Sequence, residues 1–225
     1  EAGLLSEIPE QILADGTNFE LSPMYHSLML VDMLDLINIT RAYPEGCAGG
    51  LLRLVEIKVP LMIDFMDTMA HPDGGLAFFN DCADGISPSI PKIKKYAEAL
   101  GFANRANGRT YSWLADYRES GYFCASVGES KLIFDACEIG PDYIPGHAHA
   151  DSLSFEMSIG IQRVFVNSGT SLYGLSEARI NQRKTKAHNT VEVDHTDSSQ
   201  VWSGFRVGCR ARIIERSAEI SDDGL

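Results

Sequence analysis

The motif GHAHAD contains two histidines and an aspartate, His147, His149 and Asp151, at alternate positions. In a β-strand successive side chains alternate between faces, so these three would point the same way. The same face would continue with the apolar side chains of Phe155 and Met157, which predicts a half-buried strand. Imidazoles at this spacing can bind a metal, transfer a proton or divide the two tasks. The alternative is a pair of hydrogen-bonded histidines at the end of a strand.

A third histidine, His188, is predicted to begin another strand of the same sheet. A hairpin turning near Gly160 would bring the segment 167–174, with Asn167 and Tyr173, beside the first two histidines. We therefore expect His147, His149 and His188 to converge in space. The remaining histidines are predicted to be structural: His26, His71 and His195.

A cluster of basic residues lies directly before His188. Its members are Arg179, Arg183, Lys184 and Lys186. In a chain with a net charge of −12, this local excess of cations predicts an anionic ligand. The alternative is an ordinary solvated basic loop.

The composition limits the classes of protein. A chain of 225 residues with 44% hydrophobic content can form one large domain or two small ones. The net charge of −12 argues against nucleic acid as a partner. No apolar run is long enough for membrane insertion, and no signal peptide is recognisable in this segment. The five scattered cysteines, without a CxxC motif, are predicted to be buried apolar residues.

Residues 1–105 are predicted to form a helical domain, because apolar residues recur every three or four positions. Four helices are expected. The first covers residues 7–14, the second begins at Ser22, and the fourth covers residues 89–100. The third follows a turn at residues 44–46 and is expected to kink at Pro60. Ser22 is the expected N-cap, and Pro23 occupies the first helical position. Tyr25 then lies in the first turn of its helix, where it is either a packing residue or a proton-transfer residue.

Residues 106–225 are predicted to form a β domain, because the apolar period changes from 3.6 to 2 near the linker-like stretch 103–110. Strands are expected at residues 121–127, 131–135, 152–158, 163–166, 189–194 and 210–215. Short strands separated by Gly, Pro, Asp and Ser turns are typical of an antiparallel β-sandwich. The expected fold class is therefore α+β and two-lobed, with helices first. Because the chain starts without methionine and stops among strands, we expect flanking parts of a longer parent chain.

These motifs together resemble the heparinase II/III-like polysaccharide lyases. The resemblance rests on four pieces: residues 15–26 with FELSPMYH, residues 146–156 with GHAHAD, Gly169-Thr170, and residues 183–190. It implies an α/α toroid followed by an antiparallel β-sandwich. It also implies cleavage of a uronic-acid-containing, glycosaminoglycan- or alginate-like acidic polysaccharide by β-elimination, and a periplasmic or secreted location.

The resemblance also implies roles for individual residues. Tyr25 and His147 match the catalytic tyrosine and histidine, and His149 and His188 match ligands of a metal, usually zinc. Asn167 stands where the family typically has a third, aspartate ligand, so a lower metal affinity is expected. Further predicted substrate contacts are Arg183 and Tyr173. The family's helical-domain residue that helps neutralise the uronate should lie upstream of Glu1.

Two other functions compete with a lyase. One is a non-catalytic module of the same fold that binds an acidic glycan. The other is a cupin-like metal oxygenase, which also uses His-x-His on a β scaffold. An oxygenase would need a nearby carboxylate ligand and no helical half, and strand alternation turns Glu156, the nearest candidate, to the opposite face.

Overall fold

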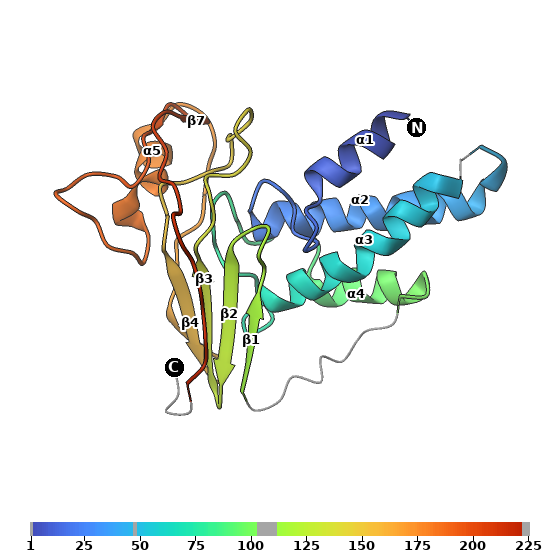
Figure 1. The fold of residues 1–225 in the computed structure, drawn as a ribbon, viewed down its shortest axis with the longest axis horizontal. Coiled ribbons are helices and arrows are strands. Elements are labelled where there is room, and N and C mark those ends of the chain that lie inside the picture. The colour runs from blue at the N-terminus through green and yellow to red at the C-terminus, as the bar shows by residue number, and fades with distance from the viewer. Residues whose placement is uncertain (1, 47–48, 103–111, 222–225) are drawn as a thin grey trace.

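A computed structural model describes residues 2–46, 49–102 and 112–221. Helices occupy the first half and an antiparallel sheet the second, which confirms a mixed α+β fold with helices before strands (Figure 1). The predicted domain boundary at residues 105 and 106 lies outside the described residues. None of the helices in the described part combines the length and apolarity needed to cross a membrane.

The helical lobe is built from amphipathic segments that share one apolar core. Its helices are α1 (Ala2–Gln11), α2 (Pro23–Ala42), α3 (Gly49–Thr68) and α4 (Ile90–Ala99), with a short 3-10 turn, η1 (Pro44–Gly46), before α3. Buried side chains from all four helices meet here, among them Ile8, Leu34, Val59 and Ile93. The first helix was predicted five residues too late, and α3 continues through Pro60 without a break.

The start of α2 follows the prediction. Ser22 has extended backbone angles, and its hydroxyl accepts a hydrogen bond from the Tyr25 backbone nitrogen at 3.4 Å. Pro23 is the first helical residue, where its missing N–H costs nothing. The same Ser22 hydroxyl donates to the backbone carbonyl of Asp81 at 2.9 Å. This cap therefore fixes Tyr25 relative to the loop that follows α3.

The sheet has five antiparallel strands in sequence order. They are β1 (Ser112–Asp116), β2 (Tyr122–Val127), β3 (Ser130–Asp135), β4 (Phe155–Ile159) and β5 (Gln162–Phe165), and a separate pair is formed by β6 (Val201–Trp202) and β7 (Arg206–Val207). The predicted hairpin between β4 and β5 is present, and Gly160 turns it with a φ of 55°. Within the described residues, no second sheet packs face to face on the first.

Three predictions about the second half were wrong. Residues 189–194 and 210–215 form no strand beyond an isolated bridge, and a helix, α5 (Glu177–Arg183), interrupts the predicted all-β region, followed by the 3-10 turn η2 (Thr185–Ala187). Three cysteines are buried as expected, Cys209 is exposed, and none of these four forms a disulfide. Cys47 lies outside the described residues.

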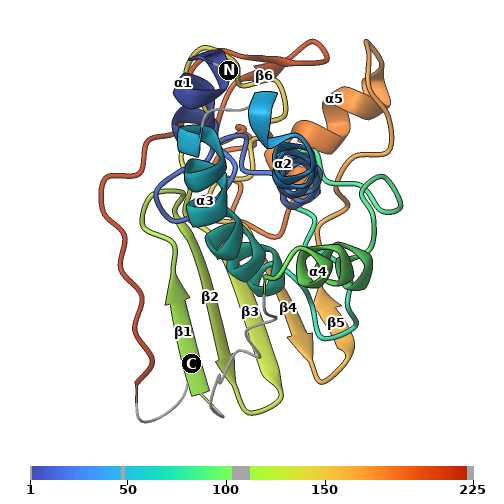
Figure 2. The same cartoon turned by 90° about the vertical axis from the view of Figure 1, so that its right-hand side faces the viewer.

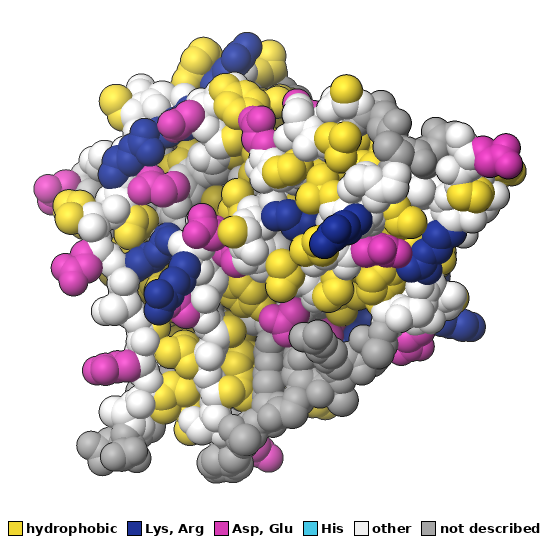
Figure 3. All heavy atoms as spheres, turned by 45° about the vertical axis from the view of Figure 1, so that its right-hand side comes forward, with side chains coloured by type: hydrophobic (Ala, Val, Ile, Leu, Met, Phe, Trp, Pro, Cys, Tyr) yellow, Lys and Arg dark blue, Asp and Glu magenta, His cyan; other side chains and the backbone are white. Residues whose placement is uncertain are grey.

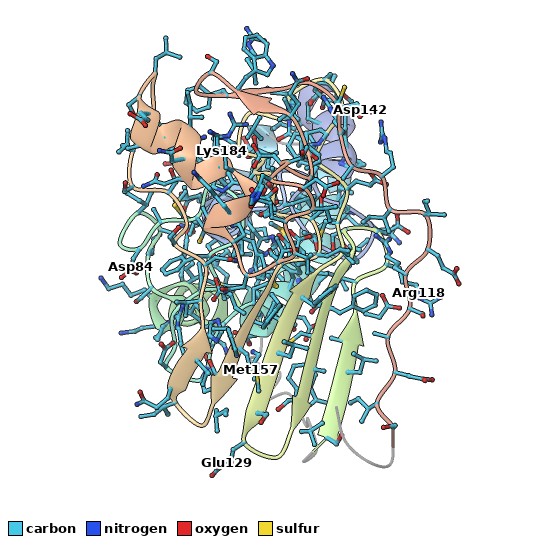
Figure 4. The ribbon with its side chains drawn as sticks, turned by 90° about the vertical axis from the view of Figure 1, so that its left-hand side faces the viewer. Asp84, Arg118, Glu129, Asp142, Met157 and Lys184 are labelled. Atoms are coloured by element: carbon cyan, nitrogen blue, oxygen red, sulfur yellow. The ribbon has the colours of Figure 1, made fainter. Side chains whose placement is uncertain are left out.

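One face of the sheet packs against the helical lobe. Tyr122 and Ile133 of the sheet share a buried cluster with Phe65 of α3 and Phe79 of the loop after it, and Figure 2 shows α3 and α4 in front of this face. The other face, seen in Figure 4 with the strands in front of the helices, includes Met157.

The buried face of β4 is the polar one. Glu156 and Ser158 are fully buried, whereas Phe155 and Met157 are half-buried on the opposite face. Phe155 and Met157 were predicted to face the core, and the structure reverses the two faces. The cause is the ring of His71, which forms hydrogen bonds with both polar side chains, with Glu156 at 2.7 Å and with Ser158 at 2.5 Å. A polar group that is fully hydrogen-bonded can replace an apolar one in a core.

Candidate functional site

The GHAHAD motif is a loop and not the predicted strand, since β4 begins only at Phe155. The loop is held by the segment after α3. The Asn80 side-chain oxygen accepts from the His149 backbone nitrogen at 2.9 Å, and the Asp81 backbone nitrogen donates to the His147 carbonyl at 3.1 Å. The expected convergence of the histidines is therefore produced by loop-to-loop pairing and not by strand alternation.

Asp81 lies at the centre of the site. Its carboxylate is fully buried and accepts hydrogen bonds from His147 Nδ1 at 3.0 Å and from His149 Nε2 at 2.8 Å. The guanidinium of Arg179, also fully buried, donates to both carboxylate oxygens, through Nη2 at 2.7 Å and through Nη1. Burial alone would raise the pKa of the Asp81 carboxyl, but the bonds from His147, His149 and Arg179 hold it well below its ordinary value.

This arrangement fixes the tautomers of both histidines. An ionised carboxylate can only accept hydrogen bonds, so His147 Nδ1 and His149 Nε2 must each bear a proton. In the neutral imidazoles, the lone pairs then lie on His147 Nε2 and on His149 Nδ1. The Asp81 carboxylate therefore leaves Nε2 of His147 free to act as a base. It also leaves Nδ1 of His149 free to bind a metal.

Tyr25 and His147 meet, although they come from different halves of the chain. Their ring centroids are 4.0 Å apart with an interplanar angle of 32°. The Tyr25 hydroxyl lies 2.8 Å from that of Tyr173, and Glu20 Oε1 lies 3.7 Å from His147 Nε2. Burial, and then the hydrogen bond with Tyr25, raise the pKa of Tyr173 well above its ordinary value. A protonated Tyr173 can donate to Tyr25, which leaves the Tyr25 proton available for another acceptor.

His149 and His188 also lie close together, as predicted, with ring centroids 5.2 Å apart. The acidic group beside them is Asp151, and one candidate ligand atom from each of the three lies within 4.8 Å of the others. His149 Nδ1 is buried without a hydrogen-bond partner, and neither ring nitrogen of His188 makes a bond of normal geometry. Burial lowers the pKa of His188 to about 4, which keeps its ring neutral. Neutral imidazoles with a carboxylate are a suitable donor set for zinc.

Asn167 is the residue that was predicted as the third metal ligand. It is buried, and its side-chain oxygen accepts from the backbone nitrogen of Asn189, the residue after His188, at 3.2 Å. The other end of the amide, Nδ2, has no partner and could not bind a cation. The carboxylate that lies with His149 and His188 in this structure is that of Asp151. In the sequence, the position of Asp151 two residues after His149 was the signal that could have indicated it as a candidate ligand.

Arg183 is not on an open surface. It is fully buried, and its guanidinium donates to the carbonyl of Ala148 at 2.8 and 3.0 Å and to that of Arg206 at 3.2 Å. In this conformation it holds the histidine loop against β7 and has no contact to offer a substrate. Of the four basic residues that were predicted to bind an anionic ligand, Lys186 is exposed, as expected for the alternative of a solvated loop. Arg179 instead lies at the site, 5.2 Å from the Tyr173 ring centroid.

Comparison with known proteins identifies the family of the chain. The models of the heparinase II/III N-terminus and of the heparinase II/III-like C-terminal region match residues 2–107 and 112–224. The chain therefore belongs to the heparinase II/III-like family.

Individual relatives are distant. The heparin-sulfate lyase of Pedobacter heparinus is 22% identical over 214 residues, covering 85% of this chain and 31% of that protein. A solved heparinase III has a TM-score of 0.70 at 21% identity, covering 89% of this chain and 34% of its own. The heparan sulfate lyase HepC of Pedobacter heparinus has a TM-score of 0.64 at 21% identity, covering 90% and 34%. These structural matches show the fold, and the chain spans about a third of the length of its relatives.

Proposed function

We propose that this chain forms the reaction centre of a polysaccharide lyase that cleaves a uronic-acid-containing glycan by β-elimination. The observation that supports this most strongly is the contact between Tyr25 and His147, with the His147 tautomer set by Asp81. The relatives named heparin-sulfate and heparan sulfate lyase favour a glycosaminoglycan as the substrate.

The reaction requires a base, an acid and a group that neutralises the uronate charge, and these residues can supply the first two. The proton on the carbon next to the uronate carboxylate moves to a base, the bond from the neighbouring carbon to the glycosidic oxygen breaks, and a carbon–carbon double bond forms. His147 Nε2 is the base, and the Tyr25 hydroxyl protonates the leaving oxygen. Tyr173 then stabilises the Tyr25 phenolate by donating its own hydrogen bond. The charge that develops on the uronate also needs a neutralising group.

The metal would be held by His149, His188 and Asp151, with Asn167 beside them. A bound zinc ion would cross-link the loops and keep His149 in the tautomer that donates to Asp81, which is a supporting role. The orphaned, buried nitrogens of His149 and His188 support this assignment.

We further infer that the parent protein is longer, with the helices here completing an α/α toroid and the sheet beginning a β-sandwich, and that it is periplasmic or secreted. The exposed surface agrees with additional packing. Ile39 and Ile57 are each 58% exposed on the helical lobe, and Figure 3 shows apolar side chains among charges of both signs.

The test uses the complete gene product and the variant Tyr25→Phe. The double bond conjugated to the carboxylate absorbs ultraviolet light, so elimination can be followed on heparan sulfate and other polyuronates. The variant should lose about 10²–10⁴-fold in turnover, because the ring packing stays and only the hydroxyl is removed. The control is Tyr43→Phe, which alters an exposed tyrosine at the end of α2. Near-normal turnover of Tyr25→Phe would mean that Tyr25 is not the acid.

The alternative is a module that binds an acidic glycan without cleaving it. That function would be favoured if the unmodified protein bound the polymers tightly while no ultraviolet absorbance developed.

A further inference from the structure

A cavity of about 580 Å³ lies beside the proposed reaction centre. Its lining includes Gly146, the residue before His147, and Phe205. The ring of Phe205 is centred 6.5 Å from that of His147 and 5.5 Å from that of Tyr173. The volume is in the range of cavities that bind small ligands. The cavity therefore adjoins the proposed catalytic side chains through Gly146 and Phe205, and it is large enough for a sugar unit.

The walls of this cavity suit a carbohydrate. Tyr143 and Phe205 present aromatic surface, being 67% and 42% exposed, and Ile144 is 50% exposed beside them. Aromatic side chains offer a large apolar contact area to the carbon–hydrogen face of a sugar ring. Exposed aromatic and apolar groups with a few convergent polar ones are the usual composition of a ligand site.

The two arginines of the cavity differ in their charge balance. Arg210 donates to Asp142 Oδ1 at 2.7 Å and to the Asp142 carbonyl at 2.8 Å, so its charge is already compensated. Arg206 is exposed, and among the described residues no carboxylate pairs with its guanidinium. Arg206 is therefore the cation of this cavity that is free to bind an anion.

The backbone of Arg206 is held in place from the protein interior. Arg206 pairs with Trp202 across the β6–β7 ribbon, and the Arg206 carbonyl accepts a hydrogen bond from the buried Arg183 at 3.2 Å. Since Arg183 also donates to Ala148, next to His147, the same side chain links the position of Arg206 to the histidine loop. A guanidinium is the side chain best suited to oxyanions such as carboxylate and sulfate.

We propose that this cavity is a subsite for the sugar unit adjacent to the one that is cleaved, and that Arg206 binds an oxyanion of that unit. Phe205 and Tyr143 pack on its ring. This inference rests on the proposed function, since it assigns the neighbouring unit of the same acidic glycan. It predicts that the protein prefers chains with an anionic group on successive sugars.

The experiment uses the complete protein with Arg206→Gln, which removes the charge and keeps most of the side-chain length. The KM for a sulfated uronate oligosaccharide should rise by about tenfold or more, with a smaller change in kcat. The matched control is Arg53→Gln, which removes an exposed arginine on α3, away from the cavity. The same substrates without sulfate distinguish the oxyanion, because a loss on both indicates carboxylate and a loss on the sulfated one alone indicates sulfate.

Direct binding separates this proposal from the lyase activity. Calorimetry with the same oligosaccharides measures the affinity of the Arg206→Gln and Arg53→Gln proteins whether or not cleavage occurs. A protein that makes no unsaturated product but binds at least tenfold more weakly after Arg206→Gln would retain the subsite and reject the lyase. An active lyase in which Arg206→Gln changes neither KM nor affinity would reject the subsite.

Discussion

Replacing Asp81 with asparagine should disable the site by reversing one hydrogen bond. The carboxylate accepts on both oxygens, from His149 and Arg179 on one and from His147 and Arg179 on the other. An amide has only one oxygen, so its NH₂ group must face one histidine N–H and one arginine N–H in either orientation. The histidine that faces the NH₂ group must then move its proton to its other nitrogen.

Each orientation of the Asp81→Asn amide removes a different function. If the NH₂ group faces His147, the proton moves to His147 Nε2, and the proposed base is blocked. If it faces His149, the proton moves to His149 Nδ1, and the nitrogen available to a metal is blocked. The change also leaves Arg179 without its anion in a fully buried position, which costs roughly 3–5 kcal/mol when a buried pair is broken. Inversion of a catalytic histidine tautomer has lowered kcat by about 10⁴-fold in a serine protease.

We therefore expect kcat to fall by about 10³–10⁴-fold if the Asp81→Asn amide turns its NH₂ group to His147. If the NH₂ group faces His149, zinc content should fall instead, and the melting temperature should fall in either case. The assays are ultraviolet detection of product, elemental analysis and thermal unfolding, and nitrogen NMR of the imidazoles reports the tautomers directly. The control is Asp84→Asn, an exposed aspartate of the same loop that is labelled in Figure 4. A folded Asp81→Asn protein with unchanged tautomers and turnover would refute this reasoning.

Two further outcomes follow from the structure. Asp151→Asn should lower zinc content, whereas Asn167→Asp should raise it by adding a second carboxylate, at the residue that bonds to the backbone beside His188. Elemental analysis after dialysis checks both. Burial lowers the pKa of His26 to about 4 from 6.5, so its neutral ring stabilises the fold above pH 6.5 and this contribution is lost as pH falls toward 4. The loss is roughly 3 kcal/mol. Urea unfolding across this pH range should show it in the unmodified protein and after His195→Gln, an exposed control, but not after His26→Gln.

Local features of the sequence were sufficient to predict several elements of the site. Ser22 and Pro23 determine where α2 begins, and so place Tyr25 in its first turn. Gly160 adopts the left-handed conformation that the hairpin between β4 and β5 requires. Both depend on neighbouring residues alone.

The errors occurred where distant residues override a local pattern. Alternation predicted that the apolar side chains of β4 face the core, but His71, 85 residues before Glu156, satisfies the polar face instead. Likewise Asp81 pairs with Arg179 across 98 residues of sequence. A carboxylate in a turn-rich loop resembles any solvated acid until its partners are known, so no sequence signal distinguished it.

One segment, residues 71–82, aligns the two halves of the chain. At one end His71 reaches Glu156 of β4, and at the other Asp81 holds both histidines of the GHAHAD loop. The same segment also holds the start of α2, because Asn80 donates to the Leu21 carbonyl at 3.0 Å and the Asp81 carbonyl accepts from the N-cap serine. Tyr25 and His147 are therefore fixed against a common support. Catalysis that needs both side chains therefore depends on the conformation of this loop.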